Sequence, residues 1–228
     1  MKRMGCVLLA ILLIGLMGCG GTAVDTDAPV GGGTTTTTTR PKPTVSVTED
    51  LLVPLDDYSW EREEAITHIV IHFTSAVTIA PTDPYNYDTI RQIFVDRQVS
   101  AHYLLDREGD VTRLVADDRA AWHAGRGTWA GDERDTNKMN KYAIGIEIMN
   151  IGTYNDMAQY LTRAQYDAQD DALLGFTDGQ YETLAALGDE LCDKYDIPTD
   201  REHILGHSEY NPAKSDPGEG FDWSKIGL

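Results

Sequence analysis

Apolar residues follow two alternating patterns from residue 47 to the end of the chain. A continuous apolar run predicts a buried strand over 65–73, and isoleucine at every second position predicts a central strand over 142–149. Apolar positions three and four residues apart predict a helix over 89–98, and a Thr-x-x-Gln capping box predicts another over 177–195. Further short strands are expected over 101–106, 111–115 and 204–206. Because strands alternate with helices, the sequence favours a single α/β domain with a central mixed β-sheet flanked by helices.

Two segments interrupt this alternation. Residues 152–176 are polar and irregular, with helical character around 163–174. The run from Gly206 to Gly218 contains two prolines and ends in glycine, which predicts a turn-rich loop rather than a helix. We expect this loop to follow directly on the short strand over 204–206.

The first 46 residues show no pattern of a folded core. Residues 1–18 combine two basic residues with a short apolar run, which is typical of a signal peptide and shorter than the roughly 20 residues of a transmembrane helix. The string Leu16-Met17-Gly18-Cys19 resembles a bacterial lipobox, in which Cys19 becomes the lipidated N-terminus. Residues 19–46 are rich in Gly, Thr and Pro and predict a disordered tether. The folded domain is therefore expected over 47–228.

The lipobox predicts attachment to a membrane through lipid rather than a membrane-spanning helix. Gly20, and not an aspartate, follows Cys19. By resemblance to Gram-negative lipoproteins, this residue favours the outer membrane. We therefore expect a lipid-anchored protein of the cell envelope, at the periplasmic face of the outer membrane.

The chain is strongly acidic, with a formal net charge of -18 at pH 7. Phosphate backbones and anionic lipid surfaces repel such a chain, so the charge argues against nucleic acid as a partner and against electrostatic adhesion to membranes. It sets no limit on an uncharged or mixed-charge substrate. We expect the protein to be a monomer.

Two histidines and one aspartate lie at or beyond the ends of predicted strands. His72 ends the apolar run over 65–73, His207 follows the strand over 204–206, and Asp216 lies nine residues further on. Taken singly, the histidines are as easily core residues and the aspartate a turn former. Together, two imidazoles and a carboxylate form a plausible three-ligand zinc site with an open position for water. This combination indicates a hydrolase.

Glu147 lies inside the predicted strand over 142–149, on the face opposite the isoleucines. One interpretation is a solvent-facing strand residue. The other is a carboxylate that faces a cleft, with a pKa suited to proton transfer. The strand alternation by itself is compatible with both.

Five segments occur in the order typical of one enzyme family. They are His68–Thr74, Val99–Leu104, Ala121–Gly125, Ile144–Ile148 and Gly206–Gly218. Through these segments, the chain resembles the zinc-dependent N-acetylmuramoyl-L-alanine amidases of the type-2 amidase family, which are related to T7-type lysozyme amidases and peptidoglycan recognition proteins. The resemblance spans roughly residues 60–225. Five ordered motifs make it specific, whereas any one of them alone is not.

The resemblance implies a site and a reaction. It assigns one Zn²⁺ to His72, His207 and Asp216, the role of general base and acid to Glu147, and stabilisation of the oxyanion to Lys214. The implied reaction is hydrolysis of the amide bond between N-acetylmuramic acid and the L-alanine of the stem peptide, in peptidoglycan or muropeptide fragments, as part of cell-wall turnover. Four further residues are expected to contact the substrate: Trp122, His123, His102 and Asn150.

Two other functions compete with the amidase. A non-catalytic peptidoglycan-binding module is the first, because relatives that lack a ligand bind without cutting. The presence of all three ligands and Glu147 argues against it. The second is a glycosidase with two carboxylates, but no acid paired with Glu147 is evident, and the two histidines would have no role.

Overall fold

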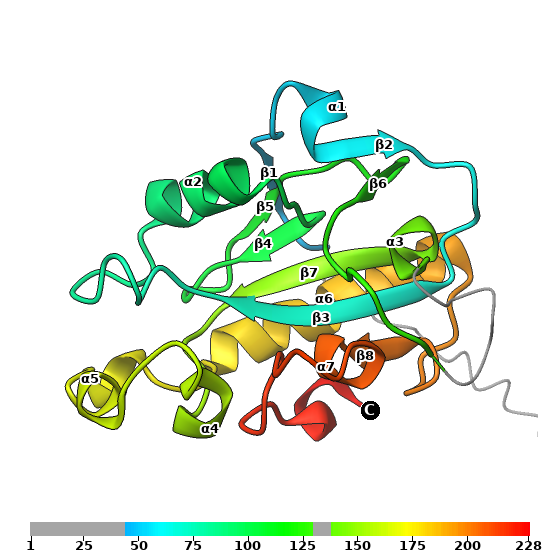
Figure 1. The fold of residues 1–228 in the computed structure, drawn as a ribbon. Coiled ribbons are helices and arrows are strands. Elements are labelled where there is room, and N and C mark those ends of the chain that lie inside the picture. The colour runs from blue at the N-terminus through cyan, green and yellow to red at the C-terminus, as the bar shows by residue number, and fades with distance from the viewer. Residues whose placement is uncertain (1–43, 130–137) are drawn as a thin grey trace, which may run out of the picture. The chain divides into compact units, whose positions relative to one another are not determined.

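The computed structural model describes residues 44–129 and 138–228. Through this part of the chain runs a six-stranded sheet in the order β1-β5-β4-β7-β3-β8 (Figure 1). Its strands are β1 (Val47–Glu49), β3 (His68–Thr74), β4 (Tyr103–Leu105), β5 (Val111–Arg113), β7 (Ala143–Met149) and β8 (Ile204–Gly206). Neighbouring strands are parallel except for β4 and β5, which form an antiparallel pair. The sheet is therefore mixed, as predicted.

The remaining elements surround this sheet. A separate antiparallel ribbon joins β2 (Ser59–Glu61) to β6 (Arg119–Ala121). The helices are α1 (Leu55–Tyr58), α2 (Tyr87–Arg97), α3 (Met139–Tyr142), α4 (Tyr154–Met157), α5 (Arg163–Asp167), α6 (Asp178–Tyr195) and α7 (His207–Tyr210), with 3-10 turns η1 (Asp171–Leu173) and η2 (Trp223–Ile226). Within the described residues, none of these helices has the length and apolar character needed to cross a bilayer.

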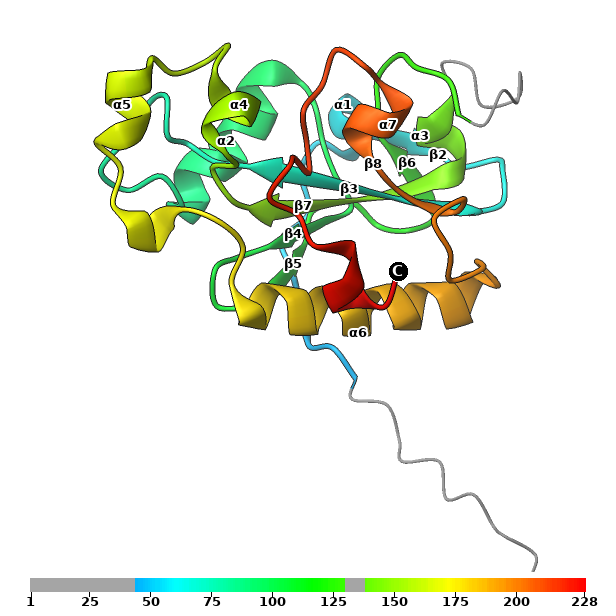
Figure 2. The same ribbon diagram turned by 90° about the horizontal axis from the view of Figure 1, so that it is seen from below.

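Helix α6 covers one face of the sheet (Figure 2). The predicted capping box is present, since Thr177 accepts a hydrogen bond from the backbone N–H of Gln180 and the Gln180 side chain accepts one from Thr177. The residues that α6 and the sheet bury against each other are almost all aliphatic: Leu184, Leu187, Leu191, Ile69, Ile71, Ile144, Ile146 and Ile148. The alternating isoleucines of β7 thus form the core face that their spacing predicts.

Helix α2 covers the other face of the sheet. It begins after Asn86, whose side chain accepts a hydrogen bond from the backbone N–H of Thr89. Its buried residues Ile90 and Phe94 pack with Leu104 of β4 in a second apolar cluster. This cluster fills the region beside β4 and leaves the middle of β3 and β7 to polar side chains.

The structure corrects one expectation about the C-terminal segment. His207 to Tyr210 form a single helical turn, α7, where a loop was expected. Pro212 and Pro217 lie beyond this turn and do not obstruct it, and the Glu209 carboxylate accepts a hydrogen bond from the backbone N–H of Gly206. The rest of the segment, 211–218, contains no helix or strand, as predicted.

The polar segment 152–176 contains the short helices α4 and α5 and the turn η1. Thr153 and Thr162 each begin a helix with a reciprocal capping box, a signal that the sequence carries locally. The predicted signal peptide over 1–18, the lipidation site Cys19 and the tether as far as residue 43 lie outside the described residues.

Candidate active site

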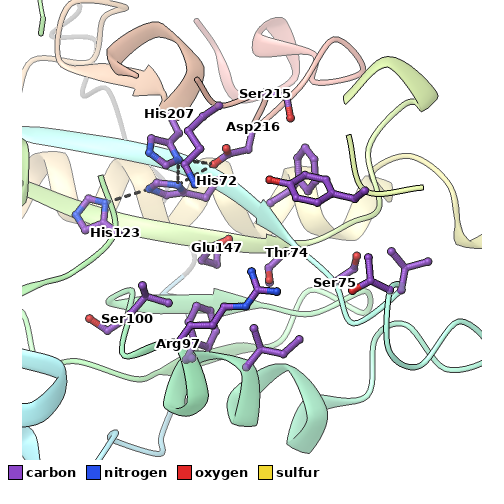
Figure 3. Close-up of a pocket in the computed structure, with 18 of the residues that line it drawn as sticks. His72, Thr74, Ser75, Arg97, Ser100, His123, Glu147, His207, Ser215 and Asp216 are labelled. Atoms are coloured by element: carbon purple, nitrogen blue, oxygen red, sulfur yellow. Dashed lines mark hydrogen bonds and ion pairs between the residues drawn. The ribbon is translucent and has the colours of Figure 1, made fainter. Parts of the chain in front are cut away.

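A pocket of about 270 Å³ opens over the polar face of β3 and β7, bounded by α2 and by residues 214–216 (Figure 3). The parallel register creates its floor, because His72 pairs with Glu147 and Ile71 pairs with Gly206, the residue before His207. Side chains that are distant in sequence are therefore neighbours on adjacent strands. The lining residues include all five of the predicted ligands and catalytic groups: His72, Glu147, His207, Lys214 and Asp216.

The three predicted metal ligands converge on one point. His72 Nδ1 lies 3.0 Å from His207 Nδ1 and 2.8 Å from Asp216 Oδ2, and His207 Nδ1 lies 2.9 Å from the same carboxylate oxygen. All three side chains offer a ligand atom within 4.8 Å of the others. Zinc bonds of about 2.0–2.2 Å in a tetrahedral site separate ligand atoms by roughly 3.3–3.6 Å, so these three donors need to move apart by only a few tenths of an ångström to hold a small divalent ion.

Burial and charge set the protonation of the ligands. Burial, together with the neighbouring His207, lowers the pKa of His72 to about 4, so its imidazole is neutral at pH 7. Burial acts to raise the pKa of Asp216, but the adjacent His207 and His72 rings outweigh it and hold the pKa below its usual value. At neutral pH the site therefore presents a neutral imidazole at His72 and a carboxylate at Asp216, the forms that bind a cation.

Glu147 occupies the floor of the pocket next to these ligands. Its Oε2 is buried and has no hydrogen-bond partner among the described residues. Burial, and then the negative charge of Asp216, raise the pKa of Glu147 well above the usual value, while Lys214 partly opposes this shift. Of the two interpretations of Glu147, the carboxylate that faces a cleft is the one that agrees with the structure.

Lys214, Trp122 and His123 line the same pocket, as their expected roles require. Trp122 is 46% exposed, and its ring lies 4.1 Å from that of Trp60 in a tilted pair. His123 is already engaged, because its Nδ1 lies 3.0 Å from His72 Nε2. The Trp122 ring is thus accessible to a bound molecule, whereas the His123 ring contacts the predicted metal ligand His72.

His102 and Asn150 are not in the pocket, which argues against the substrate contacts expected for them. His102 is fully buried, and its Nδ1 accepts a hydrogen bond from the backbone N–H of Gly145 at 2.9 Å. Its Nε2 lies 3.0 Å from the Arg119 carbonyl, so both ring nitrogens have partners inside the fold. Asn150 is only 1% exposed. Their neighbourhood in sequence to pocket residues misled the expectation.

Sequence reasoning missed three residues that shape the pocket. Arg97, at the end of α2, points toward the pocket (Figure 3), and no hydrogen bond or ion pair holds its guanidinium among the described residues. The Asn140 side chain accepts hydrogen bonds from two backbone N–H groups of the Trp122–Gly125 segment. Gly145 lies under the His123 ring, and a Cβ there would meet His123 Cγ at 2.5 Å. Only Gly145 left a signal, because glycine inside a strand often marks a close approach.

The sequence and the fold match one group of enzymes. Residues 62–219 match the protein family described as N-acetylmuramoyl-L-alanine amidase. The 1,6-anhydro-N-acetylmuramyl-L-alanine amidase AmpD of Escherichia coli (strain K12) is 30% identical over 185 residues, which cover 81% of this chain and 80% of AmpD. The N-acetylmuramoyl-L-alanine amidase AmiD of the same strain is 28% identical, and the match covers 69% of this chain and 51% of AmiD.

A solved structure of AmiD from E. coli, in complex with the substrate anhydro-N-acetylmuramic acid-L-Ala-D-gamma-Glu-L-Lys, has a similar fold. It superimposes with a TM-score of 0.53 at 26% sequence identity, covering 71% of this chain and 56% of that chain. The part of AmiD that has no counterpart here is large, so the match concerns the domain that contains the pocket.

Proposed function

Because the chain belongs to the N-acetylmuramoyl-L-alanine amidase family, we propose that it hydrolyses the amide bond between N-acetylmuramic acid and the L-alanine of the stem peptide, with zinc held by His72, His207 and Asp216. One observation carries the proposal. Three donor atoms, 2.8–3.0 Å from one another, face a pocket whose floor holds Glu147, and the buried Oε2 of this residue has no hydrogen-bond partner in the described part of the chain. Binding alone does not require such a carboxylate, whereas hydrolysis requires a proton acceptor beside the water.

The residues divide the chemistry between them. A zinc ion held by His72, His207 and Asp216 would lower the pKa of a bound water and polarise the carbonyl of the scissile amide. Glu147 accepts the proton of the attacking water and later donates it to the leaving amine of L-alanine, and its raised pKa brings both transfers closer to neutral pH. Lys214, on the wall of the pocket, stabilises the negative charge that develops on the carbonyl oxygen.

The substrate we propose is a muropeptide or peptidoglycan strand. Support comes from the AmiD complex, whose ligand is an anhydromuramyl tripeptide, and from Trp122, which lines the pocket. A sugar ring packs its C–H groups on an aromatic face, and the exposed part of Trp122 offers such a face next to the ligand triangle. The Trp60 ring contacts the Trp122 ring, with 4.1 Å between their centroids.

The location we propose is the cell envelope, with Cys19 lipidated and the protein held as a monomer at the periplasmic face of the outer membrane. Two features of the sequence support this location: the lipobox, which marks Cys19 for lipidation, and the Gly- and Thr-rich tether that follows it. Replacing Cys19 by serine is expected to release the protein from the membrane fraction. A Cys19→Ser protein that stays in that fraction after high-salt washing contradicts the lipid anchor.

Digestion of purified muropeptides by the full-length protein tests the activity. Mass spectrometry is expected to show free stem peptide that begins with L-alanine, and a chelator is expected to abolish its release until zinc is restored. Muropeptide that binds but stays intact indicates a recognition module. New reducing sugar ends without free stem peptide indicate a glycosidase, and either result contradicts the amidase.

A further inference from the structure

We propose that the segment Trp122–Gly125 positions both histidine ligands of the metal site, one through the side chain of His123 and the other through the carbonyl of Ala124. This inference rests on the proposed function, because it concerns the ligands of the zinc ion. His123 and Ala124 are positioning residues and do not touch the reacting atoms. Each histidine ligand turns Nδ1 toward the other two ligands, and its Nε2 contacts this segment.

The proton of His207 is placed by Ala124. His207 Nδ1 faces the ligand triangle, and His207 Nε2 lies 3.0 Å from the Ala124 carbonyl oxygen. A carbonyl only accepts hydrogen bonds, so Nε2 must carry the proton. The lone pair of a neutral ring is then on Nδ1, where the metal binds. The Ala124 carbonyl thus selects the tautomer that a metal ligand needs.

The proton of His72 is placed by His123. His72 Nδ1 faces Asp216, and His72 Nε2 lies 3.0 Å from His123 Nδ1. When Nδ1 of His72 binds an ion, the single proton of the neutral ring is on Nε2. It is donated to His123 Nδ1, which accepts it. His123 therefore does for His72 what the Ala124 carbonyl does for His207.

His123 is an unfavourable residue for packing alone. With Nδ1 accepting, its own proton is on Nε2, which is buried and has no hydrogen-bond partner among the described residues. A buried polar group without a partner destabilises the fold. An apolar side chain would avoid this cost, so the bond to His72 is the interaction that explains an imidazole at this position.

The segment is held firmly enough to orient its neighbours. Asn140 Oδ1 accepts hydrogen bonds from the backbone N–H groups of His123 at 3.2 Å and of Ala124 at 2.7 Å. On the other side, Ser100 Oγ accepts one from the backbone N–H of Trp122 at 2.8 Å, and the Ser100 N–H donates to the Trp122 carbonyl at 3.1 Å. Two side chains from other parts of the chain thus clamp the segment at both ends.

Zinc affinity tests this arrangement without relying on turnover. The full-length protein is compared with His123→Leu, which removes the acceptor, and with His123→Asn, whose side-chain oxygen lies near the position of Nδ1. Competition with a chromophoric chelator gives the dissociation constant. We expect His123→Leu to weaken zinc binding about 10- to 100-fold and His123→Asn to restore most of the loss, as for other residues that support a metal ligand.

Two further proteins keep the test decisive. Trp122→Ala changes the same segment at a side chain to which we assign no role in positioning His72 or His207. It is expected to keep the zinc affinity of the wild type. Asn140→Ala keeps the His123 imidazole but removes the hydrogen bonds that Asn140 accepts from the backbone of the segment. We expect it to weaken zinc binding several-fold, and it provides the test if His123→Leu does not fold. In ¹⁵N spectra, His72 of the wild type should carry its proton on Nε2, and this preference should decrease in His123→Leu.

The outcomes separate the inference from the function on which it rests. If the wild type binds no zinc, the proposed metal site is wrong. If the wild type binds zinc and both His123→Leu and Asn140→Ala bind it equally well, the site stands and the positioning role of the segment is wrong.

Discussion

The two faces of the central sheet differ most in the middle of strands β3 and β7. Toward α6, these strands present the isoleucines Ile69, Ile71, Ile144, Ile146 and Ile148, which are buried with the leucines of α6. Toward the pocket, the intervening positions of the same strands present His72 and Glu147, with the His123 ring packed over Gly145. The apolar face buries hydrocarbon against hydrocarbon. On the pocket face, the buried atoms Glu147 Oε2 and His123 Nε2 have no hydrogen-bond partner within residues 44–129 and 138–228.

Stability and chemistry therefore depend mainly on different faces of the sheet. Apolar burial contributes about 25 cal/mol per Å², whereas a buried polar atom without a partner costs free energy. The α6 face therefore stabilises the fold, and it offsets the cost of a polar face that is organised for hydrolysis. Substitutions on the two faces should consequently separate: one set should change stability and the other activity.

The largest separation is expected from Glu147→Gln. The amide cannot accept the proton of the attacking water, so amide hydrolysis should fall by about 10²- to 10⁴-fold. The free energy of unfolding should stay the same or rise slightly, because an uncharged group replaces a buried carboxyl. Rates on a defined muropeptide and denaturant unfolding measure the two quantities. A variant that hydrolyses at the wild-type rate contradicts the proton-transfer role.

The reverse separation is expected from Leu187→Ala on α6. This side chain is 2% exposed and packs in the isoleucine cluster, so its truncation should cost about 2–5 kcal/mol of stability. Activity per folded molecule should hardly change, because no residue of α6 lines the pocket. Denaturant unfolding and rates below the unfolding transition measure this. A large loss of rate in the folded state would show that the two faces are coupled.

The same contrast explains how far sequence reasoning reached. Strand β7 could be predicted with its orientation, because isoleucine at every second position places Glu147 on the opposite face. Helix α6 was predicted to within a residue from its capping box and its apolar period. The ordered motifs then predicted the three side chains, His72, His207 and Asp216, that meet in the donor triangle. All of these signals are local in the sequence.

What could not be predicted depends on contacts between distant segments. The strands β2 and β6 are three residues each and pair only with one another, so neither has a periodic pattern to read. The roles of His102 and Asn140 depend on which backbone groups lie beside them in the folded chain, at Gly145 and at His123. A substrate-contact role for His102 therefore looked plausible from its neighbours in sequence, and only the tertiary structure shows that the ring lies inside the fold.

A third expected effect concerns acid and a histidine buried beside Gly145 of β7. Burial, together with the charge of Arg62, lowers the pKa of His102 from 6.5 to about 3 in the folded protein. Below pH 6.5 the unfolded chain therefore binds a proton at this residue that the folded chain does not. The contribution of the neutral His102 ring to stability is therefore fully present above pH 6.5. It falls as the pH decreases toward 3, by about 1.4 kcal/mol per pH unit within this window.

Substituting the residue should remove this part of the pH dependence. We expect His102→Asn, which keeps an acceptor for the Gly145 N–H, to be less stable than the wild type at pH 7 and to approach it as the pH falls to 5. Denaturant unfolding in the presence of a chelator measures this without a contribution from bound metal. Leu187→Ala is the matched control, because it retains every histidine and should lie parallel to the wild type at all pH values. If the stability of His102→Asn has the same pH dependence as that of the wild type, the acid sensitivity does not originate in this buried ring.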